Sequence, residues 1–240
     1  MTGQENADVS ALDLAALGQR NRRPKNVPPT VIIIAPSAAV QYESRGSHHQ
    51  SGVDLADLYA SCGFDIRLVE SVDSRKPFRL SPSLVHVSTP LESTTRAPYF
   101  DLSAPYSESR FASKSRGFDL SAAALAQWLR ESPDCLVVLD PPYPGSPLDI
   151  PEQLLRRNLF AAQLLAQLPA AAILGIGLNE YHTYPSVDLL ATAVREGQTL
   201  ADTFHMLVRR RLSWTGPEWL AAGSTALFAA PATYSTRVLS

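Results

Sequence analysis

The sequence is poor in the residues that mark several protein classes. Its 240 residues include only two cysteines, Cys62 and Cys135, so it lacks the disulfide framework of a small secreted domain, and we expect a reducing, cytoplasmic compartment. Both thiols lie in segments that we expect to be buried. No apolar run reaches the length of a membrane span, and no charged segment precedes a short apolar core as in a leader. We therefore expect neither membrane insertion nor secretion.

An excess of one charge and a phosphate-binding loop are lacking as well. The chain carries 21 Lys and Arg against 23 Asp and Glu, a formal net charge of -2, which gives no general attraction to nucleic acid. Residues 35–39, Ala-Pro-Ser-Ala-Ala, lack the glycines and the lysine that cradle a phosphate group. We expect no nucleic-acid partner and no cofactor.

Histidines are too scattered to predict a metal site. His48 and His49 are adjacent, Glu43 lies near them, and His182 lies in a later loop. Adjacent side chains point in different directions, and no third ligand follows at helical spacing. Loop histidines without a metal are therefore the favoured interpretation.

What the chain does contain is a regular alternation of short apolar runs with helical periodicities. Residues 1–29 are polar and are predicted to be a flexible N-terminal segment, whereas 30–240 are predicted to form one domain. The pattern predicts a three-layer α/β sandwich with a mostly parallel central sheet of about six strands. Strands are expected at 30–35, 64–69, 84–88, 136–139, 170–176 and, at an edge, 225–229. Helices are expected between Ser51 and Gly63, at 122–130, from Pro151 onward, at 186–195 and at 198–212.

Two further expectations concern the second and third quarters of the chain. Residues 91–117 are rich in Ser, Thr, Pro, Arg and Tyr, and are too many for a loop unless they are functional, mobile or contain a small hairpin. In the helix that begins near Pro151, an apolar stripe is expected to face the sheet. Its members are Leu155, Leu159, Ala162 and Ala166.

The candidate site follows from the stretch 134–147. Its apolar run 136–139 reads as a buried strand, and Asp140 ends that strand directly before a cluster of prolines. Ligands of open α/β sheets bind at the carboxyl ends of the strands. His86, near the end of strand 84–88, is expected beside Asp140. A buried structural histidine is favoured over an acid/base pair, although a rebuilt hydrolase site using these two residues, or Ser88 or Ser146, stays open.

From about residue 30 to 230 the order of segments resembles the CHAT domain, a bacterial relative of the caspases in the caspase and separase clan of cysteine peptidases. Residues 136–140, Leu-Val-Val-Leu-Asp, resemble the strand that ends at the nucleophile of that family. Further similar segments are Leu159–Leu165, Ala170–Leu178, Arg195–Asp202 and Pro217–Gly223. The resemblance implies a caspase-like fold.

The resemblance also implies that the peptidase chemistry has been lost. The family uses a histidine and a cysteine at the ends of two adjacent strands, with an oxyanion held by backbone amides, including that of the glycine after the histidine. In this sequence His86 stands at a first, structural histidine position. Pro90 and Leu91 stand at the catalytic histidine and glycine, and Pro142 stands at the cysteine. Proline can neither accept a proton nor attack a carbonyl, so the chain is predicted to be a pseudoprotease.

A pseudoprotease of this kind is expected to bind a protein partner as a regulatory module, in a bacterial defence or signalling assembly. Tyrosines near the expected edge are the contact candidates, because tyrosine combines apolar area with a polar tip. They are Tyr42, Tyr99, Tyr143 and Tyr181, with Tyr106 in the same group. A self-associating scaffold, and hence a homo-oligomer, is a further hypothesis.

Overall fold

The structure is a computed structural model of the whole chain. It describes residues 29–35, 41–42, 47–48, 52–69, 82–89, 91–93, 97–101, 119–141, 147–176, 184–196, 198–212 and 225–230. The predicted N-terminal segment therefore lies outside the described residues, apart from residue 29.

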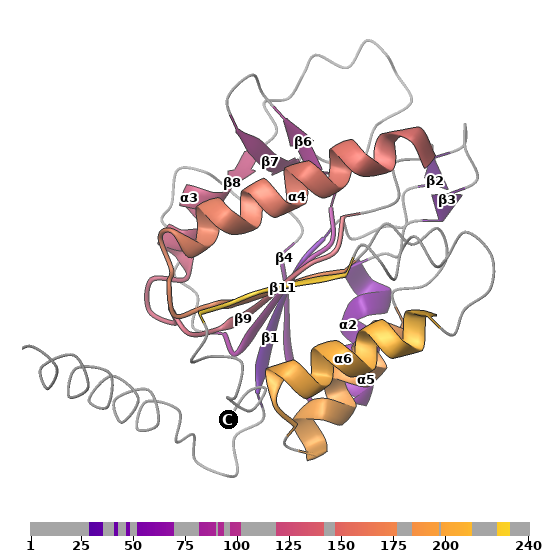
Figure 1. The fold of residues 1–240 in the computed structure, drawn as a ribbon. Coiled ribbons are helices and arrows are strands. Elements are labelled where there is room, and N and C mark those ends of the chain that lie inside the picture. The colour runs from indigo at the N-terminus through magenta and orange to yellow at the C-terminus, as the bar shows by residue number, and fades with distance from the viewer. Residues whose placement is uncertain are drawn as a thin grey trace, which may run out of the picture.

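A six-stranded sheet forms the middle layer, with the strand order β11-β10-β9-β5-β1-β4 (Figure 1). Every neighbouring pair is parallel except β10 with β11, which is antiparallel and closes one edge. The strands are β1 (Thr30–Ile34), β4 (Asp65–Val69), β5 (Leu84–Val87), β9 (Leu136–Leu139), β10 (Ala172–Gly175) and β11 (Ala226–Phe228). The predicted fold class is confirmed.

Helices cover both faces of this sheet (Figure 1). On one face lie α2 (Gly52–Ser61), α5 (Tyr184–Glu196) and α6 (Leu200–Leu212). The other face is covered by α3 (Ala122–Trp128) and α4 (Ile150–Leu165), which follows a short 3-10 helix, Pro147–Asp149. A small antiparallel sheet of β6 (Leu91–Ser93), β7 (Pro98–Asp101) and β8 (Asp119–Ser121) packs beside them. The chain also pairs β2 (Gln41–Tyr42) with β3 (Ser47–His48).

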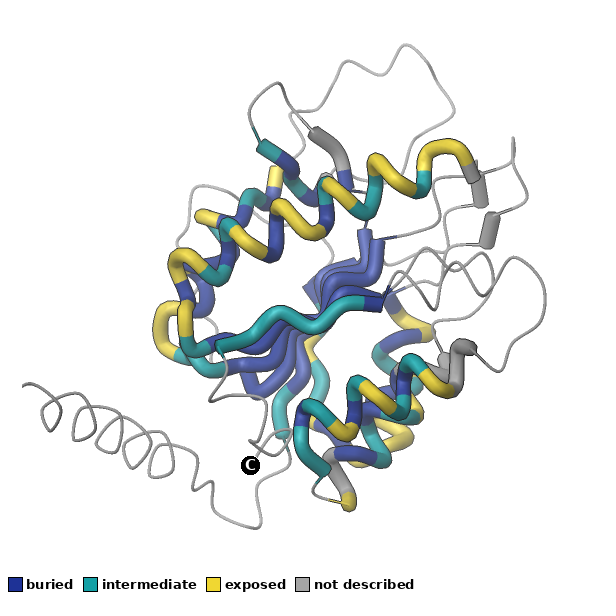
Figure 2. The backbone as a smooth tube through the Cα atoms, in the orientation of Figure 1, coloured by how far each residue is buried: buried dark blue, intermediate teal, exposed yellow. Residues whose placement is uncertain are grey.

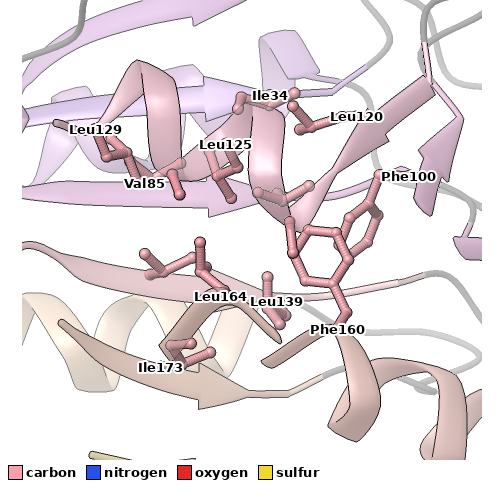
Figure 3. Close-up of a cluster of buried hydrophobic side chains, with 14 of the residues drawn as sticks. Ile34, Val85, Phe100, Leu120, Leu125, Leu129, Leu139, Phe160, Leu164 and Ile173 are labelled. Atoms are coloured by element: carbon pink, nitrogen blue, oxygen red, sulfur yellow. The ribbon is translucent and has the colours of Figure 1, made fainter. Parts of the chain in front are cut away.

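The central strands are buried on both sides, as their continuous apolar runs require (Figure 2). Alternate residues point to opposite faces, so each strand contributes to two cores. In β9, Val137 and Leu139 pack toward α3 and α4, whereas Leu136 and Val138 pack toward α2 and α5. Aromatic rings fill the first core, where Phe100 and Phe160 meet edge to face with their centroids 4.9 Å apart (Figure 3).

Local signals fix several element ends. The helix α2 stops before Gly63, whose φ of 86° lies in the left-handed region that glycine adopts without strain. At the start of α3, the Ser121 hydroxyl accepts a hydrogen bond from the amide of Ala124 at 3.2 Å. Between residues 91 and 117, β6 and β7 form the small hairpin that was one of the three explanations for that long segment.

The predicted orientation of α4 is wrong. Leu155 and Leu159 are exposed, as are Ala162 and Ala166, and the buried face is another stripe. That face contains Arg157, Phe160, Ala161 and Leu164. The helix carries two apolar stripes, and the one with Phe160 buries the larger side-chain area against the sheet.

On its buried face, α4 places a charged side chain over the end of β10. The guanidinium of Arg157 is buried and donates from Nη2 to Asn158 Oδ1 at 3.1 Å. Gly175 gives it room, because a Cβ at Gly175 would lie 2.7 Å from Arg157 Nε and 2.8 Å from Cζ. A Cβ at position 175 would therefore force the buried guanidinium of Arg157 to shift.

We expect Gly175→Ala to lower the free energy of unfolding by about 1 to 3 kcal/mol, because the added methyl group overpacks a buried site. Urea denaturation measures the loss. The matched double variant with Arg157→Leu removes the guanidinium, so Gly175→Ala should then cost clearly less than in the natural background. Equal costs in both backgrounds would contradict this explanation.

Candidate functional site

The candidate site is built around His86, the third residue of β5. Its neighbours Val85 and Val87 pack toward α3 and α4, so alternation directs the imidazole to the α2 side of the sheet. There it is completely buried. A buried imidazole must find partners for both ring nitrogens.

Both nitrogens of His86 have partners. Tyr59 Oη, on α2, lies 2.9 Å from Nδ1, and Asp140 Oδ2 lies 3.2 Å from Nε2. An ionised carboxylate only accepts, so we assign the Nε2 hydrogen as the donor to Asp140. In the tautomer that donates from Nε2, the Nδ1 lone pair accepts the hydrogen of the Tyr59 hydroxyl. One directed chain of hydrogen bonds therefore runs from Tyr59 through His86 to Asp140, and we call it the Tyr–His–Asp network.

Asp140 brings this network to the edge of the sheet. It follows the last residue of β9, and its amide donates to the carbonyl oxygen of Val87 in the adjacent β5 at 2.9 Å. The strand order reverses between β5 and β1, where open α/β sheets place their ligand crevice. At 5% exposure, Asp140 is the most accessible member of the network, since Tyr59 and His86 are fully enclosed.

The Tyr59 hydroxyl is locked in its protonated form. Burial raises the pKa of this phenol far above its ordinary value, and the negative charges of Asp140 and Cys62 raise it further. Its ring stands edge-on to those of Phe64 and His86, with centroids 5.5 Å and 5.8 Å away. Tyr59 thus serves as a permanent hydrogen-bond donor.

The order hydroxyl, imidazole, carboxylate is that of a hydrolytic triad, but the hydroxyl here cannot act as a nucleophile. A nucleophile needs contact with substrate, and Tyr59 has no exposed surface. Ser88, which directly follows β5, is also buried. Within the described residues, the network satisfies buried polar groups and offers no free base to a substrate.

Both thiols lie at the opposite edge. Cys62 follows α2 and precedes β4, and Cys135 directly precedes β9, so each stands at the amino end of a strand. Because the whole chain has only these two cysteines, no thiol is available at the edge that holds Asp140. Cys135 is buried as predicted, but Cys62 is exposed, because it lies beyond the last turn of α2. The prediction that both thiols are buried is therefore wrong for Cys62.

The pKa of the Cys135 thiol is raised from 9.0 to about 12. The larger cause is burial, and the second is the negative charge of Asp134. Above about pH 9 the unfolded chain loses this proton while the folded chain keeps it, so stability falls as pH rises. We expect a loss of about 1.4 kcal/mol per pH unit between about pH 9 and 12. Tyr59 adds to the loss above about pH 10.

Urea denaturation under reducing conditions, from about pH 8 to about pH 11, measures this slope. In Cys135→Ala the decline should begin near pH 10 instead of pH 9, because the contribution of Tyr59 is left. An unchanged profile would mean that Cys135 does not cause the early decline.

Several predicted site residues cannot be placed from the described part of the chain. Pro90, Pro142, Tyr143, Tyr181 and Ser146 lie outside it, as do Glu43, His49, Tyr106 and His182. Tyr42 and His48 are described only as backbone, in β2 and β3. Tyr99 is half-buried on β7, beside α4, on the face of the sheet opposite to His86.

Two residues of the described core were not identified as polar partners from the sequence. The sequence pattern shows Tyr59 only as one more apolar position of its helix, although a buried tyrosine usually needs a partner for its hydroxyl. Arg157 gave no signal, because arginine on a helix is usually exposed. Within the described ranges, no three His, Cys, Asp or Glu side chains gather closely enough to hold a metal ion.

None of the helices in the described ranges is both long enough and apolar enough to cross a membrane. The chain matches no family model and no curated protein.

Proposed function

We propose that this chain is a catalytically inactive, CHAT-like pseudoprotease that binds a protein partner at the carboxyl edge of its sheet. The observation that carries the proposal is the position of the thiols. Cysteine-peptidase chemistry requires a thiol at the end of the strand that here ends in Asp140, and both cysteines precede strands instead.

The arrangement of β5 and β9 supports the proposal. The resemblance calls for two adjacent strands that end at the same edge, and β5 pairs with β9 in parallel register from Leu84 with Leu136 to Val87 with Leu139. The positions that the resemblance assigns to the catalytic histidine and cysteine, Pro90 and Pro142, come soon after these strands in the sequence.

A hydrolase with a rebuilt site fits less well. Such a site needs a base with one nitrogen free for substrate, and His86 is enclosed with both nitrogens bonded. Of the two serine candidates, Ser88 is buried, and Ser146 lies outside the described residues. The edge is better suited to recognition, because Pro141 and the prolines at 142, 144 and 147 restrict the backbone and lower the entropy cost of binding.

Peptide hydrolysis tests the inactive state. The intact protein is incubated with a mixed-sequence fluorogenic peptide library, beside the variants Cys62→Ala and Cys135→Ala. We expect no turnover above the buffer blank in any sample. Turnover that a thiol reagent abolishes, and that one of the two variants lacks, would overturn the proposal.

Site-directed photo-crosslinking in the source cells tests the binding surface. p-Benzoylphenylalanine replaces Tyr143, three residues after Asp140 in the sequence, or Asp65, an exposed residue at the amino end of β4. We expect one discrete protein adduct from position 143 and none from position 65. The same adduct from both positions, or none from position 143, would count against a partner at the carboxyl edge.

A further inference from the structure

The Tyr–His–Asp network uses one oxygen of Asp140 and leaves the other unengaged. Oδ2 lies 3.2 Å from Nε2 of His86, which is the one ion-pair partner of this carboxyl group in the described part of the chain. Oδ1 makes no hydrogen bond to a described residue. It is also not among the buried side-chain atoms left without a partner, so it reaches the surface. The network therefore holds the carboxyl group in place and leaves one acceptor accessible.

Ser88 brings a second acceptor to the same place. It follows β5 as Asp140 follows β9, and the pairing of Val87 with Leu139 puts these two residues next to each other at the strand ends. Ser88 comes two residues after His86, so alternation directs its hydroxyl to the α2 side of the sheet as well. Within the described ranges, Ser88 Oγ has no hydrogen-bond partner and is not among the buried unpaired atoms. Two accessible oxygens therefore lie on one face of adjacent strands.

The position of these oxygens in the sheet is one where ligands bind. The amide of Ser88 donates to the carbonyl oxygen of Ile34 in β1 at 2.9 Å, so the residue next to Ser88 on that side is Ala35. Ala35 belongs to the core on the α2 side, and its single methyl group occupies little space there. The strand order reverses between β1 and β5, and open α/β sheets bind ligands at this point, beyond the carboxyl ends of the strands.

We propose that Asp140 and Ser88 bind the guanidinium group of an arginine side chain from the protein partner. A guanidinium carries five N–H donors in a planar fork, so that one can bond to Asp140 Oδ1 and another to Ser88 Oγ. It is more weakly hydrated than the ammonium group of lysine, which favours arginine here because both receiving side chains are almost completely buried. The origin of the arginine in a protein rests on the proposed function, whereas the site itself does not.

Titration of the intact, isotope-labelled chain with N-acetylarginine amide tests the site, with the backbone amide signals of Ser88 and Asp140 followed by NMR. We expect saturable shifts with a dissociation constant of about 1 to 20 mM, as suits a ligand of this size. N-acetylcitrulline amide has nearly the same shape and no charge, so it should bind at least about tenfold more weakly. No saturable shift, or equal binding of the two compounds, would overturn the proposal.

Three variants assign the contacts. In Asp140→Asn the amide oxygen still accepts from His86 Nε2, so the fold is kept, and we expect the dissociation constant for N-acetylarginine amide to rise at least about tenfold. Ser88→Ala removes one neutral acceptor and should raise it about two- to tenfold. Asp65→Asn, at an exposed position on the amino end of β4, is the matched control and should leave binding unchanged. Circular dichroism of each variant verifies that it is folded. Unchanged binding in either Asp140→Asn or Ser88→Ala would contradict the site.

Photo-crosslinking from position 143 decides whether the arginine belongs to the partner. When Asp140→Asn is added to that protein, we expect the yield of the adduct to fall at least about tenfold. An unchanged yield, beside normal binding of N-acetylarginine amide, would assign the site to a small guanidinium compound and overturn the proposal for the partner. An adduct that is missing already with Asp140 present would count against the proposed function, while the NMR titration still decides the site.

Discussion

His86→Ala is expected to lower the free energy of unfolding by about 3 to 5 kcal/mol. The substitution leaves the Tyr59 hydroxyl and the Asp140 carboxylate buried with a cavity between them, and each loses the hydrogen bond that it makes to the imidazole. Because the Asp140 carboxyl group is only 5% exposed, the loss of its partner should account for most of the cost. Urea denaturation at neutral pH, followed by circular dichroism, measures the change.

The control is Tyr59→Phe, which removes one hydroxyl and keeps the ring. It leaves only Nδ1 of His86 without a partner, so we expect a smaller loss of about 1 to 3 kcal/mol. The two substitutions should be strongly non-additive, since they break the same chain of hydrogen bonds. A folded His86→Ala protein with natural stability and a lost enzymatic activity would reverse the interpretation, and the histidine would then be catalytic.

Phe160→Ala is expected to cost a similar amount, about 3 to 5 kcal/mol, for a different reason. Its ring fills the core between α4 and the sheet and meets Phe100 edge to face (Figure 3). Truncation removes that area and leaves a cavity that the surrounding strands cannot close. Denaturation by urea measures the loss.

Leu155→Ala is the matched control on the same helix. Its side chain is 68% exposed, so we expect a change within about 0.5 kcal/mol. The pair of variants decides which of the two apolar stripes of α4 faces the sheet. A large loss from Leu155→Ala, with a small one from Phe160→Ala, would favour the orientation that the sequence pattern suggested.

Much of the architecture could be predicted because single elements carry strong signals. The runs 30–34 and 136–139 are short, continuous and apolar, which is typical of strands buried on both faces. The helix ends at Gly63 and Ser121 were recognisable from their residue types. The buried face of α4 could not be recognised from the sequence. The two apolar stripes of the helix have similar periodicity, and only the packing of Phe160 decides which of them faces the sheet.

The candidate site could also be predicted only in part. Parallel strands that neighbour each other end at one edge, so His86 could be expected beside Asp140 without a structure. The contact between Tyr59 and His86 could not be expected, because the distance between them depends on how α2 is rotated against the sheet. The exposure of Cys62 could not be predicted either. It arises because Cys62 lies beyond the last turn of α2 and so does not pack in the core.

The Tyr–His–Asp network also bears on how the chain folds. Tyr59 and His86 are 27 residues apart in the sequence, and His86 and Asp140 are 54 apart. Contacts across such separations close long loops and tend to form late. The elements from β1 through β5 therefore cannot bury His86 with both nitrogens satisfied until β9 has docked. During synthesis, the N-terminal half of the sheet therefore has no complete core until Asp140 has emerged from the ribosome.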